Sequence, residues 1–550
     1  MTTAEAPSMM PTPIPPRDDF PVTWQSPEEG FLLWEQEQLH FPHAMTPLSG
    51  QFICRVITSG LGGHLKKMGA PVAGVLGRRI NTYIYQAVMP DFALIEGTEE
   101  RMKATVAAHG FTMYQRWCDE FQGRVEALNE SIRSFDYDGA TDAELGRQFE
   151  TVLAAVDEMW DIHFQLLPGF YTSVAFKGAC AAMFGFEGLE AYEMIQGRMN
   201  KSVESGSKLY QLTKSASPAV RAVIEGNTSV AAMQQLAGSE EGRAFLVDLQ
   251  AYLDVYGWRT GSFDLINPSW IERPEMALDS VRLMFRATVD PADEQARGAE
   301  RADVLANECR AKLADNPAAL GEFNFLLDCA RNYPLLQENH NFYLDQKFFA
   351  IGRMAMLGFG RRLAKAGVIA ETEDIHFLQI EDIQAYFAGD TSSKQDVVAA
   401  GKAELAKWKD VTPSLALGAR PPVEGGDPFL TDFFGKSETK HSDDAKVLKG
   451  TPSSRGVATG TARVIRNLAD ADRVQDGDIL VCDMTTPAWT PLFGSLAAIV
   501  SDSGGPLSHC AVVCREYGLP CVTGTRVATA TIPDGARITV DGATGTVTIH

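Results

Sequence analysis

The chain has 550 residues, a length that fits two to four domains with sizeable buried cores. Its 49 basic and 71 acidic residues give a formal net charge of −22, which argues against nucleic acid or an anionic membrane surface as the main partner. The nine cysteines are odd in number and include no CxxC pair and no His/Cys cluster at metal-ligand spacing. We therefore expect reduced thiols, a cytoplasmic location, and neither a disulfide nor a metal bound by this chain.

The first predicted element is a flexible tail over residues 1–19. Its first sixteen residues are proline-rich and hold no lysine, no arginine and no long apolar run, unlike a signal peptide. Residues 20–410 follow with helical periodicity, as in Glu144–Trp160, where apolar residues recur every three or four positions. We predict a mostly α-helical domain over this range, with no segment suited to span a membrane.

Residues 411–446 lose this periodicity and become rich in proline, glycine and charge, as in Gly418–Pro428. This composition is typical of a linker. Two interpretations are open: the linker is an ordinary connector, or it is a tether on which a second domain, residues 447–550, swings between two sites.

A histidine motif stands in this second domain. Gly504 and Gly505 precede Ser508, His509 and an apolar stretch, which predicts a helix start behind a glycine turn. Glycine allows a positive φ and a close approach of the backbone to a ligand, and a first helical turn offers free N–H groups to an anion. His509 is therefore either a structural helix-capping residue or a nucleophile that carries a phosphoryl group.

Further blocks surround the motif. They run from Leu448-Lys449-Gly450-Thr451-Pro452 through Thr486-Pro487-Ala488-Trp489 to Val540-Asp541-Gly542. In order and spacing they resemble the phosphohistidine swivelling domain of the family that includes phosphoenolpyruvate synthase, pyruvate phosphate dikinase and rifampin phosphotransferase. The resemblance covers residues 448–550 and implies a multidomain α+β protein in which a β/β/α swivelling domain follows the helical domain.

The same resemblance implies that His509 receives a phosphoryl group and passes it on. Gly504, Gly505 and Ser508 would then lie around the phosphate. Arg455 or Arg515 would add positive charge, although both arginines have an equally good structural interpretation.

The helical region resembles, more weakly, the acceptor-binding domain of rifampin phosphotransferase. The similarity rests on His43-Ala44-Met45-Thr46-Pro47, on Tyr256-Gly257-Trp258-Arg259 with Phe263-Asp264, and on Gln337-Glu338-Asn339-His340-Asn341-Phe342. In the family the last block usually reads Arg-Glu-x-x-Lys, so Gln337 and Asn341 stand here in place of two cations. Glu338 is the candidate acid–base, since a carboxylate within hydrogen-bond reach takes the proton of an acceptor hydroxyl.

The other candidates on this side each have a structural alternative. His340 is either a second catalytic group or a solvated helix residue. Arg259 and Asp264 either bind the acceptor or form an ion pair beside a turn, and His43 either binds the acceptor or belongs to a turn. Trp258 and Phe342 either line an apolar pocket or pack in the core.

No nucleotide site is recognisable. Gly60–Lys67 lacks the Gly-Lys-Ser/Thr ending of a phosphate-binding loop, and we expect no room for a pyruvate-binding barrel in the 41 residues after His509. The arrangement resembles phenylphosphate synthase and related alkylphenol-phosphorylating systems. That resemblance implies a separate ATP-grasp subunit that binds ATP and Mg²⁺, and a phenolic or other apolar hydroxyl acceptor. The alternatives are a phosphocarrier or regulatory protein without small-molecule chemistry, and a non-catalytic paralogue.

Overall fold

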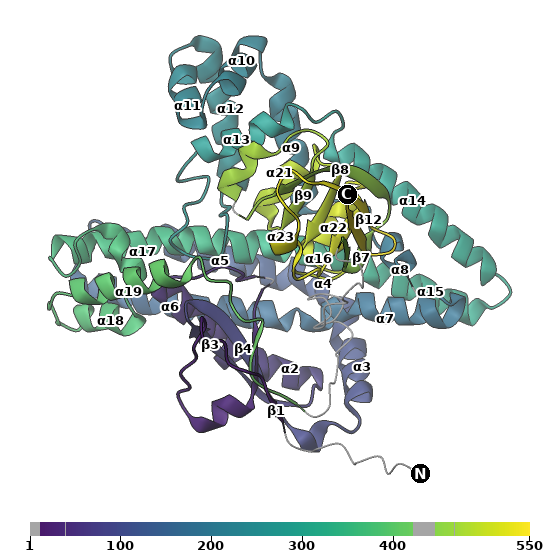
Figure 1. Ribbon diagram of the computed structural model, residues 1–550, viewed down its shortest axis with the longest axis horizontal. Helices are drawn as coiled ribbons and strands as arrows, with labels where there is room; N and C mark the ends of the chain where they lie inside the picture. The colour runs from purple at the N-terminus through teal and green to yellow at the C-terminus, as the bar shows by residue number, and fades with distance from the viewer. Residues whose placement is uncertain (1–10, 39, 187, 422–445, 467) are drawn as a thin grey trace.

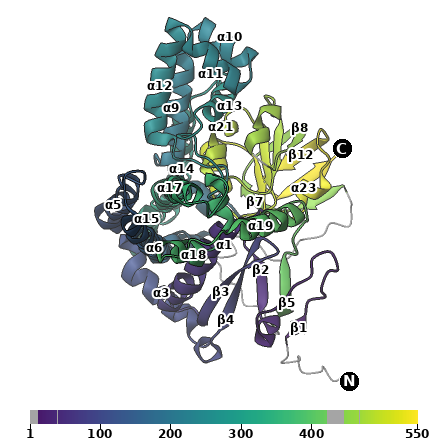
Figure 2. The same cartoon turned by 90° about the vertical axis from the view of Figure 1, so that its left-hand side faces the viewer.

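A computed structural model of the chain describes residues 11–38, 40–186, 188–421, 446–466 and 468–550. A long helical platform crosses the middle of the molecule, with a five-stranded sheet below it and a helical lobe above it (Figure 1). The carboxy-terminal β-domain, yellow in Figure 1, sits on the platform beside that lobe (Figure 2). The predicted multidomain α+β class is confirmed.

The sheet below the platform is antiparallel, with the strand order β1-β5-β2-β4-β3. The strands are β1 (Thr12–Pro13), β2 (Leu33–Gln36), β3 (Val72–Ile80), β4 (Tyr83–Pro90) and β5 (Ala416–Arg420). Buried aromatic side chains cover it, including Phe20, Trp34 and Tyr85 from the sheet region and Trp408 from the end of a helix.

Two predicted segments, the tail and the linker, each contain a strand of this sheet. Strand β1 lies within the predicted tail of residues 1–19, and β5 lies within the predicted linker of residues 411–446. Both predictions are wrong over these strands because β5 pairs with β1 and β2, which gives its backbone groups partners. Residues 1–10 and 422–445, which make up most of the predicted tail and linker, lie outside the described residues.

The helical platform is built from amphipathic helices around one large apolar core. They are α1 (Pro47–Val56), α2 (Gly62–Met68), α3 (Thr98–His109), α4 (Met113–Arg116), α5 (Gln122–Arg133), α6 (Asp142–Gln165), α7 (Leu167–Phe184), α16 (Tyr333–His340), α17 (Lys347–Lys365), α18 (Ile380–Phe387) and α19 (Gln395–Trp408). Helix α6 shows why the periodicity predicts it: a capping box joins Thr141 and Glu144 at its start, and Leu145, Phe149 and Val152 then face the core.

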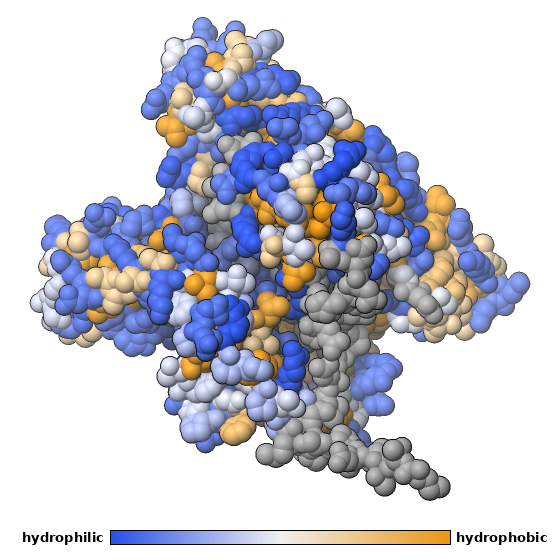
Figure 3. Space-filling view, viewed as in Figure 1, coloured by the Kyte–Doolittle hydropathy of each residue, from blue (hydrophilic) through white to orange (hydrophobic). Residues whose placement is uncertain are grey.

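The upper lobe and its flanks complete the helical region. They comprise α8 (Glu190–Met194), α9 (Lys201–Ser215), α10 (Pro218–Gly226), α11 (Ser229–Ala237), α12 (Glu240–Tyr256), α13 (Glu275–Met284), α14 (Pro291–Lys312) and α15 (Pro317–Ala330). The lobe has an apolar core of its own. The face drawn in Figure 3 is mostly hydrophilic, and across the described ranges no helix combines the length and apolar character that a membrane crossing requires.

Three helical turns within the described part of the chain widen to π-helical geometry. They are η2 (Ile57–Leu61), η5 (Trp117–Phe121) and η6 (Asn341–Gln346). The last directly continues α16, so that Gln337, Glu338 and His340 lie on α16 and Asn341 begins η6. Because π-turns are rare and frequently occur at functional sites, η6 indicates a candidate functional site in this part of the platform.

The carboxy-terminal domain has an eight-stranded sheet with the order β6-β13-β12-β8-β9-β10-β11-β7. Its elements are β6 (Val447–Lys449), β7 (Thr451–Ser454), β8 (Val457–Val464), β9 (Ile479–Cys482), α21 (Thr490–Phe493), β10 (Ala498–Ser501), α22 (His509–Glu516), β11 (Cys521–Thr523), α23 (Ala528–Thr531), β12 (Arg537–Asp541) and β13 (Thr546–Ile549). Strands β8 to β11 pair in parallel, and α22 connects β10 to β11. His509 therefore stands at the carboxyl end of a parallel strand, where sheets of this kind place their ligands.

Candidate active site

His509 is the first residue of α22, as the glycine turn predicts. Gly504 has a φ of 96°, a left-handed conformation that glycine adopts without steric cost. Ser508 precedes the helix in an extended conformation and its hydroxyl donates to the Gly505 carbonyl at 2.8 Å. These local bonds hold the loop so that the imidazole points out of the β-domain towards the helical platform, and only 7% of His509 is exposed.

The partner of His509 is Glu338 of α16. The Nδ1 atom of His509 lies 2.8 Å from Oε2 of Glu338, and the Ser202 hydroxyl of α9 donates to the same oxygen at 2.5 Å. Because a carboxylate only accepts, His509 holds its proton on Nδ1 and leaves the Nε2 lone pair available. Neither Nε2 of His509 nor Oε1 of Glu338 has a protein partner among the described residues. The geometry thus presents one nucleophilic nitrogen and one free carboxylate oxygen.

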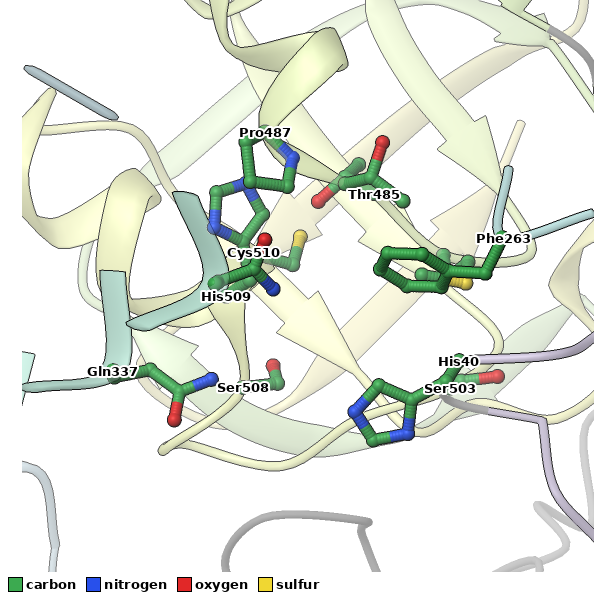
Figure 4. A pocket seen from close by; sticks show the side chains of 12 residues that line it. His40, Phe263, Gln337, Thr485, Pro487, Ser503, Ser508, His509 and Cys510 are labelled. Atoms are coloured by element: carbon green, nitrogen blue, oxygen red, sulfur yellow. The ribbon is translucent and has the colours of Figure 1, made fainter. Parts of the chain in front are cut away.

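A small cavity of about 30 Å³ adjoins this pair. It is lined by His40, Phe263, Gln337, Asn341, Met484, Thr485, Thr486, Pro487, Ser503, Ser508, His509 and Cys510. Figure 4 shows Gln337 on one side of His509 and Phe263 with His40 on the other. The volume has room for a water molecule or two and is far below the about 150 Å³ of a cavity that binds benzene. The cavity is therefore too small for an aromatic molecule in this arrangement of the two domains.

Arg259 lies behind the Thr486–Pro487 turn. It is 1% exposed, and its Nη1 donates to the Pro487 carbonyl at 3.0 Å. Its Nε and Nη2 groups have no hydrogen-bond partner among the described residues. Burial lowers the pKa of this guanidinium, but arginine keeps its charge. A buried cation with unused donors close to the cavity is a suitable anchor for an anion.

Asp264 has a structural role instead. Its carboxylate accepts from the Thr46 amide at 2.8 Å and from the hydroxyls of Thr46 and Ser49, both at 2.7 Å. It thus anchors the residue that precedes α1 and a hydroxyl of its first turn. The alternative that Arg259 and Asp264 form an ion pair is wrong, because each of them bonds to other groups. His43, just before α1, is exposed and does not line the cavity.

Arg455 and Arg515, the predicted phosphate ligands, hold the two domains together in this arrangement. Arg455 pairs with Glu190 at 2.8 Å and with Glu193 at 2.7 Å, both on α8. Arg515 donates to the Ser453 carbonyl at 2.8 Å and stacks over the Tyr192 ring. Neither lines the cavity, so both side chains are committed to structural contacts here.

The remaining candidates lie in the core. His340 is 2% exposed, so the solvated-helix alternative is wrong: its Nδ1 donates to the Leu336 carbonyl at 2.7 Å, and burial lowers the pKa of the ring to about 4. Phe342 is buried in the lobe core. Trp258 is partly buried and its indole donates to the Asp254 carbonyl. None of the three lines the cavity.

Several residues of the site were not predicted. His40, in the cavity lining, and Ser202, which bonds to Glu338, have no recognisable motif. Thr486 and Pro487 belong to a block that carries the family resemblance, and Gln337 and Asn341 lie in the same block as Glu338. The sequence therefore marked these four positions, but only their proximity to His509 in the structure assigns them to the site.

Two family models match the chain on either side of the Glu338–His509 contact. The model described as "Rifampicin phosphotransferase fourth domain" matches residues 159–338, and the one described as "PEP-utilising enzyme, mobile domain" matches residues 474–545. The chain belongs to the phosphoenolpyruvate synthase and rifampicin phosphotransferase-like family. The predicted resemblance is therefore confirmed, and the two matched regions meet where the mobile-domain histidine touches the last residue of the other match.

Individual relatives align with the chain over different lengths. The chain is 32% identical over 574 residues to chondramide synthase cmdD of Chondromyces crocatus, an alignment that spans all of this chain and 14% of the relative. It is 32% identical over 324 residues to the rifampicin phosphotransferase of Bacillus subtilis, with 58% of this chain and 36% of the relative covered. Prodigiosin synthesizing transferase PigC of Serratia marcescens is 29% identical over 425 residues, with 74% and 46% covered. The chain thus spans less than half the length of these relatives.

Proposed function

We propose that the chain is the phosphohistidine-carrying part of an ATP-dependent phosphotransferase that phosphorylates a hydroxyl group of an apolar, phenolic acceptor. The observation that carries this proposal is the hydrogen bond between His509 of the mobile domain and Glu338 of the helical platform. A nucleophile on one domain and a general base on the other are what a transfer between two sites requires.

The first half-reaction takes place with the β-domain swung away from the platform. The Nε2 lone pair of His509 attacks the β-phosphorus of ATP held by a separate ATP-grasp subunit, so that a P–N bond forms, the bond to the oxygen of AMP breaks and AMP leaves. Water then displaces the γ-phosphate, which leaves as inorganic phosphate. Mg²⁺ on that subunit supplies charge neutralisation for this step. The 7% exposure of His509 in the docked arrangement supports this division, since a donor has no access to it there.

The second half-reaction takes place on the platform. The acceptor oxygen attacks the phosphoryl group, the P–N bond breaks, and the hydroxyl proton passes to Glu338. Oxygen Oε2 is occupied by His509 and Ser202, whereas Oε1 has no protein partner among the described residues. Oε1 is therefore the atom that takes the proton.

Charge on the transferred group needs a counterpart on the protein. Gln337 and Asn341 contribute amides to the cavity where the family usually carries two cations. The unused donors of buried Arg259, next to Pro487, supply a positive charge from the other side. Phe263, Met484 and Pro487 add apolar groups to the lining, which supports an apolar acceptor.

The test is a charging experiment followed by an acceptor screen. The purified chain is mixed with a candidate ATP-grasp subunit and Mg-ATP, and intact mass spectrometry with peptide mapping follows an acid-labile phosphoryl group. We expect a phosphoryl group on the His509 peptide only when the subunit is present, and its loss when a phenol is added.

Each other result has a definite meaning. Charging that no phenol or aliphatic alcohol discharges would favour a phosphocarrier. Charging without the second subunit would contradict the separate ATP site, and no charging with any candidate subunit would contradict the phosphotransferase proposal.

A further inference from the structure

Directly behind Glu338 lies a buried cluster that the proposed reaction does not use. It consists of His163 near the end of α6, His340 at the end of α16 and Asp345 in the π-turn η6. One potential ligand atom from each residue lies within 4.8 Å of the others. The side chains of His340 and Asp345 are 2% and 4% exposed, whereas that of His163 is 14% exposed and gives the cluster an edge towards solvent.

The π-turn is the reason that this cluster exists. Residues five positions apart point to different faces of an α-helix, which turns once in about 3.6 residues. A wider π-turn, with its i to i+5 bonding, brings such residues over one another. His340 and Asp345 are five positions apart, and η6 spans the interval between them. The irregular turn therefore sets the carboxylate against the imidazole.

The imidazole of His340 and the carboxylate of Asp345 face each other with no proton between them. Nδ1 of His340 donates to the Leu336 carbonyl at 2.7 Å, so a neutral ring has its lone pair on Nε2. That nitrogen faces Oδ2 of Asp345 at 3.6 Å, too far for a hydrogen bond. Two acceptors that face each other in a buried site repel unless a cation stands between them.

The spacing suits a metal ion. His163 Nδ1 lies 3.2 Å from Oδ1 of Asp345, and His340 Nε2 lies 3.6 Å from Oδ2. Two ligands bound to Zn²⁺ at about 2.0–2.2 Å in a tetrahedral arrangement stand about 3.4 Å apart. The hydrogen bond from His340 to Leu336 is the outer contact that commonly orients a metal-binding histidine.

We propose that His163, His340 and Asp345 bind one divalent transition-metal ion of the zinc class. Two imidazoles and a carboxylate are a common ligand set for such ions. On binding, His163 moves its proton from Nδ1 to Nε2, so both rings coordinate in their neutral form. The metal would tie α6 to the junction of α16 and η6, two residues after Glu338, and so hold the helix that positions this carboxylate against His509.

A second cluster has to be separated from this site in any experiment. Cys510, Cys514 and Cys521 of the β-domain also lie within 4.8 Å of one another, and all three are buried. Thiolate ligands give cobalt an intense charge-transfer absorption that imidazole and carboxylate ligands do not give, so the two sites differ spectroscopically.

The experiment uses the full chain. Metal content is measured by mass spectrometry after purification without chelator, and the chelator-treated protein is then titrated with Co²⁺ and Zn²⁺. We expect about one ion per chain, visible Co²⁺ bands without thiolate charge transfer, and a lower melting temperature after chelation. His163→Gln and Asp345→Asn should each weaken Co²⁺ binding by at least about tenfold.

His64→Gln is the matched control. His64 is also buried and pairs with a carboxylate on α6, Asp161, at 2.6 Å, but within the described part of the chain no second histidine joins that pair. This variant should bind Co²⁺ like the wild type. The proposal is overturned if the wild type takes up no metal, if its Co²⁺ spectrum shows thiolate ligands, or if both ligand variants bind as tightly as the control. The wild-type spectrum decides the question even if a ligand variant fails to fold.

Discussion

The two sides of the site around His509 are built in different ways. On the β-domain side, Gly504, Ser508 and His509 belong to one short loop whose bonds run between near neighbours. On the platform side, Glu338, Ser202 and Arg259 come from three separate segments: the Ser202 hydroxyl donates to Glu338, and Arg259 donates to the Pro487 carbonyl of the β-domain. The first side carries the proposed nucleophile, and because its bonds are local it would keep its geometry if the domain moved. The second side forms only when the helical segments pack together, so a substitution at one of its residues should leave the other residues in place.

The largest expected effect concerns the nucleophile. His509→Ala removes the nitrogen that forms the P–N bond, so phosphoryl transfer should fall by at least about 10³-fold. Steady-state assays with the ATP-grasp subunit measure the loss, and intact mass should show no acid-labile phosphate. Acceptor binding and the melting temperature should stay close to wild type. Retained turnover would contradict the role of His509.

Glu338→Gln tests the platform side alone. Removing the base should slow transfer to the acceptor by about 10²- to 10³-fold while charging of His509 stays fast. Single-turnover assays that start from phosphorylated protein separate the two steps. Ser202→Ala, which leaves the carboxylate in place, should have a smaller effect. Equal slowing of both half-reactions in Glu338→Gln would place the residue outside the acceptor step.

The contact between the two sides should depend on pH through Glu516 of α22. Its carboxylate lies against the Gly197 amide at 3.1 Å, and burial raises its pKa from 4.5 to about 7. The docked state therefore holds the proton more tightly than an undocked state does. Docking should be strongest below pH 4.5 and weaken as the pH rises to about 7, by at most about 3 kcal/mol. Energy transfer between dyes on the two domains measures this change, and Glu516→Gln should remove the pH dependence.

The smallest effect is expected for Arg455. Its side chain is about half exposed, and its ion pairs with Glu190 and Glu193 join the two sides at the surface. Arg455→Ala should shift the docking equilibrium only about 2- to 5-fold, and less at high salt. The same dye pair measures docking, and Arg463→Ala, in the β-domain away from α8, serves as control. A large loss of His509 charging would show that Arg455 binds phosphate after all.

Much of the architecture was predictable because it depends on local patterns. The apolar periodicity of Glu144–Trp160 predicts α6, and its capping box sets where the helix begins. Strand β5 was missed because Ala416–Arg420 reads as linker composition, and only its pairing with β2, nearly 400 positions earlier, makes it a strand. The short strand β1 was missed for the same reason.

The sequence by itself determined the proposed nucleophile, its glycine turn and the helix that begins at His509, because these features depend on residues a few positions apart. Only the tertiary structure decided which carboxylate meets that histidine, since Glu338 lies 171 positions away and is brought there by domain docking. It also decided that Asp264 bonds to Thr46 and Ser49 and not to Arg259, which keeps unused donors. The His163–Asp345 contact joins residues 182 positions apart, and no spacing rule reveals such a pair, because side chains meet through the packing of helices and not through their order in the chain.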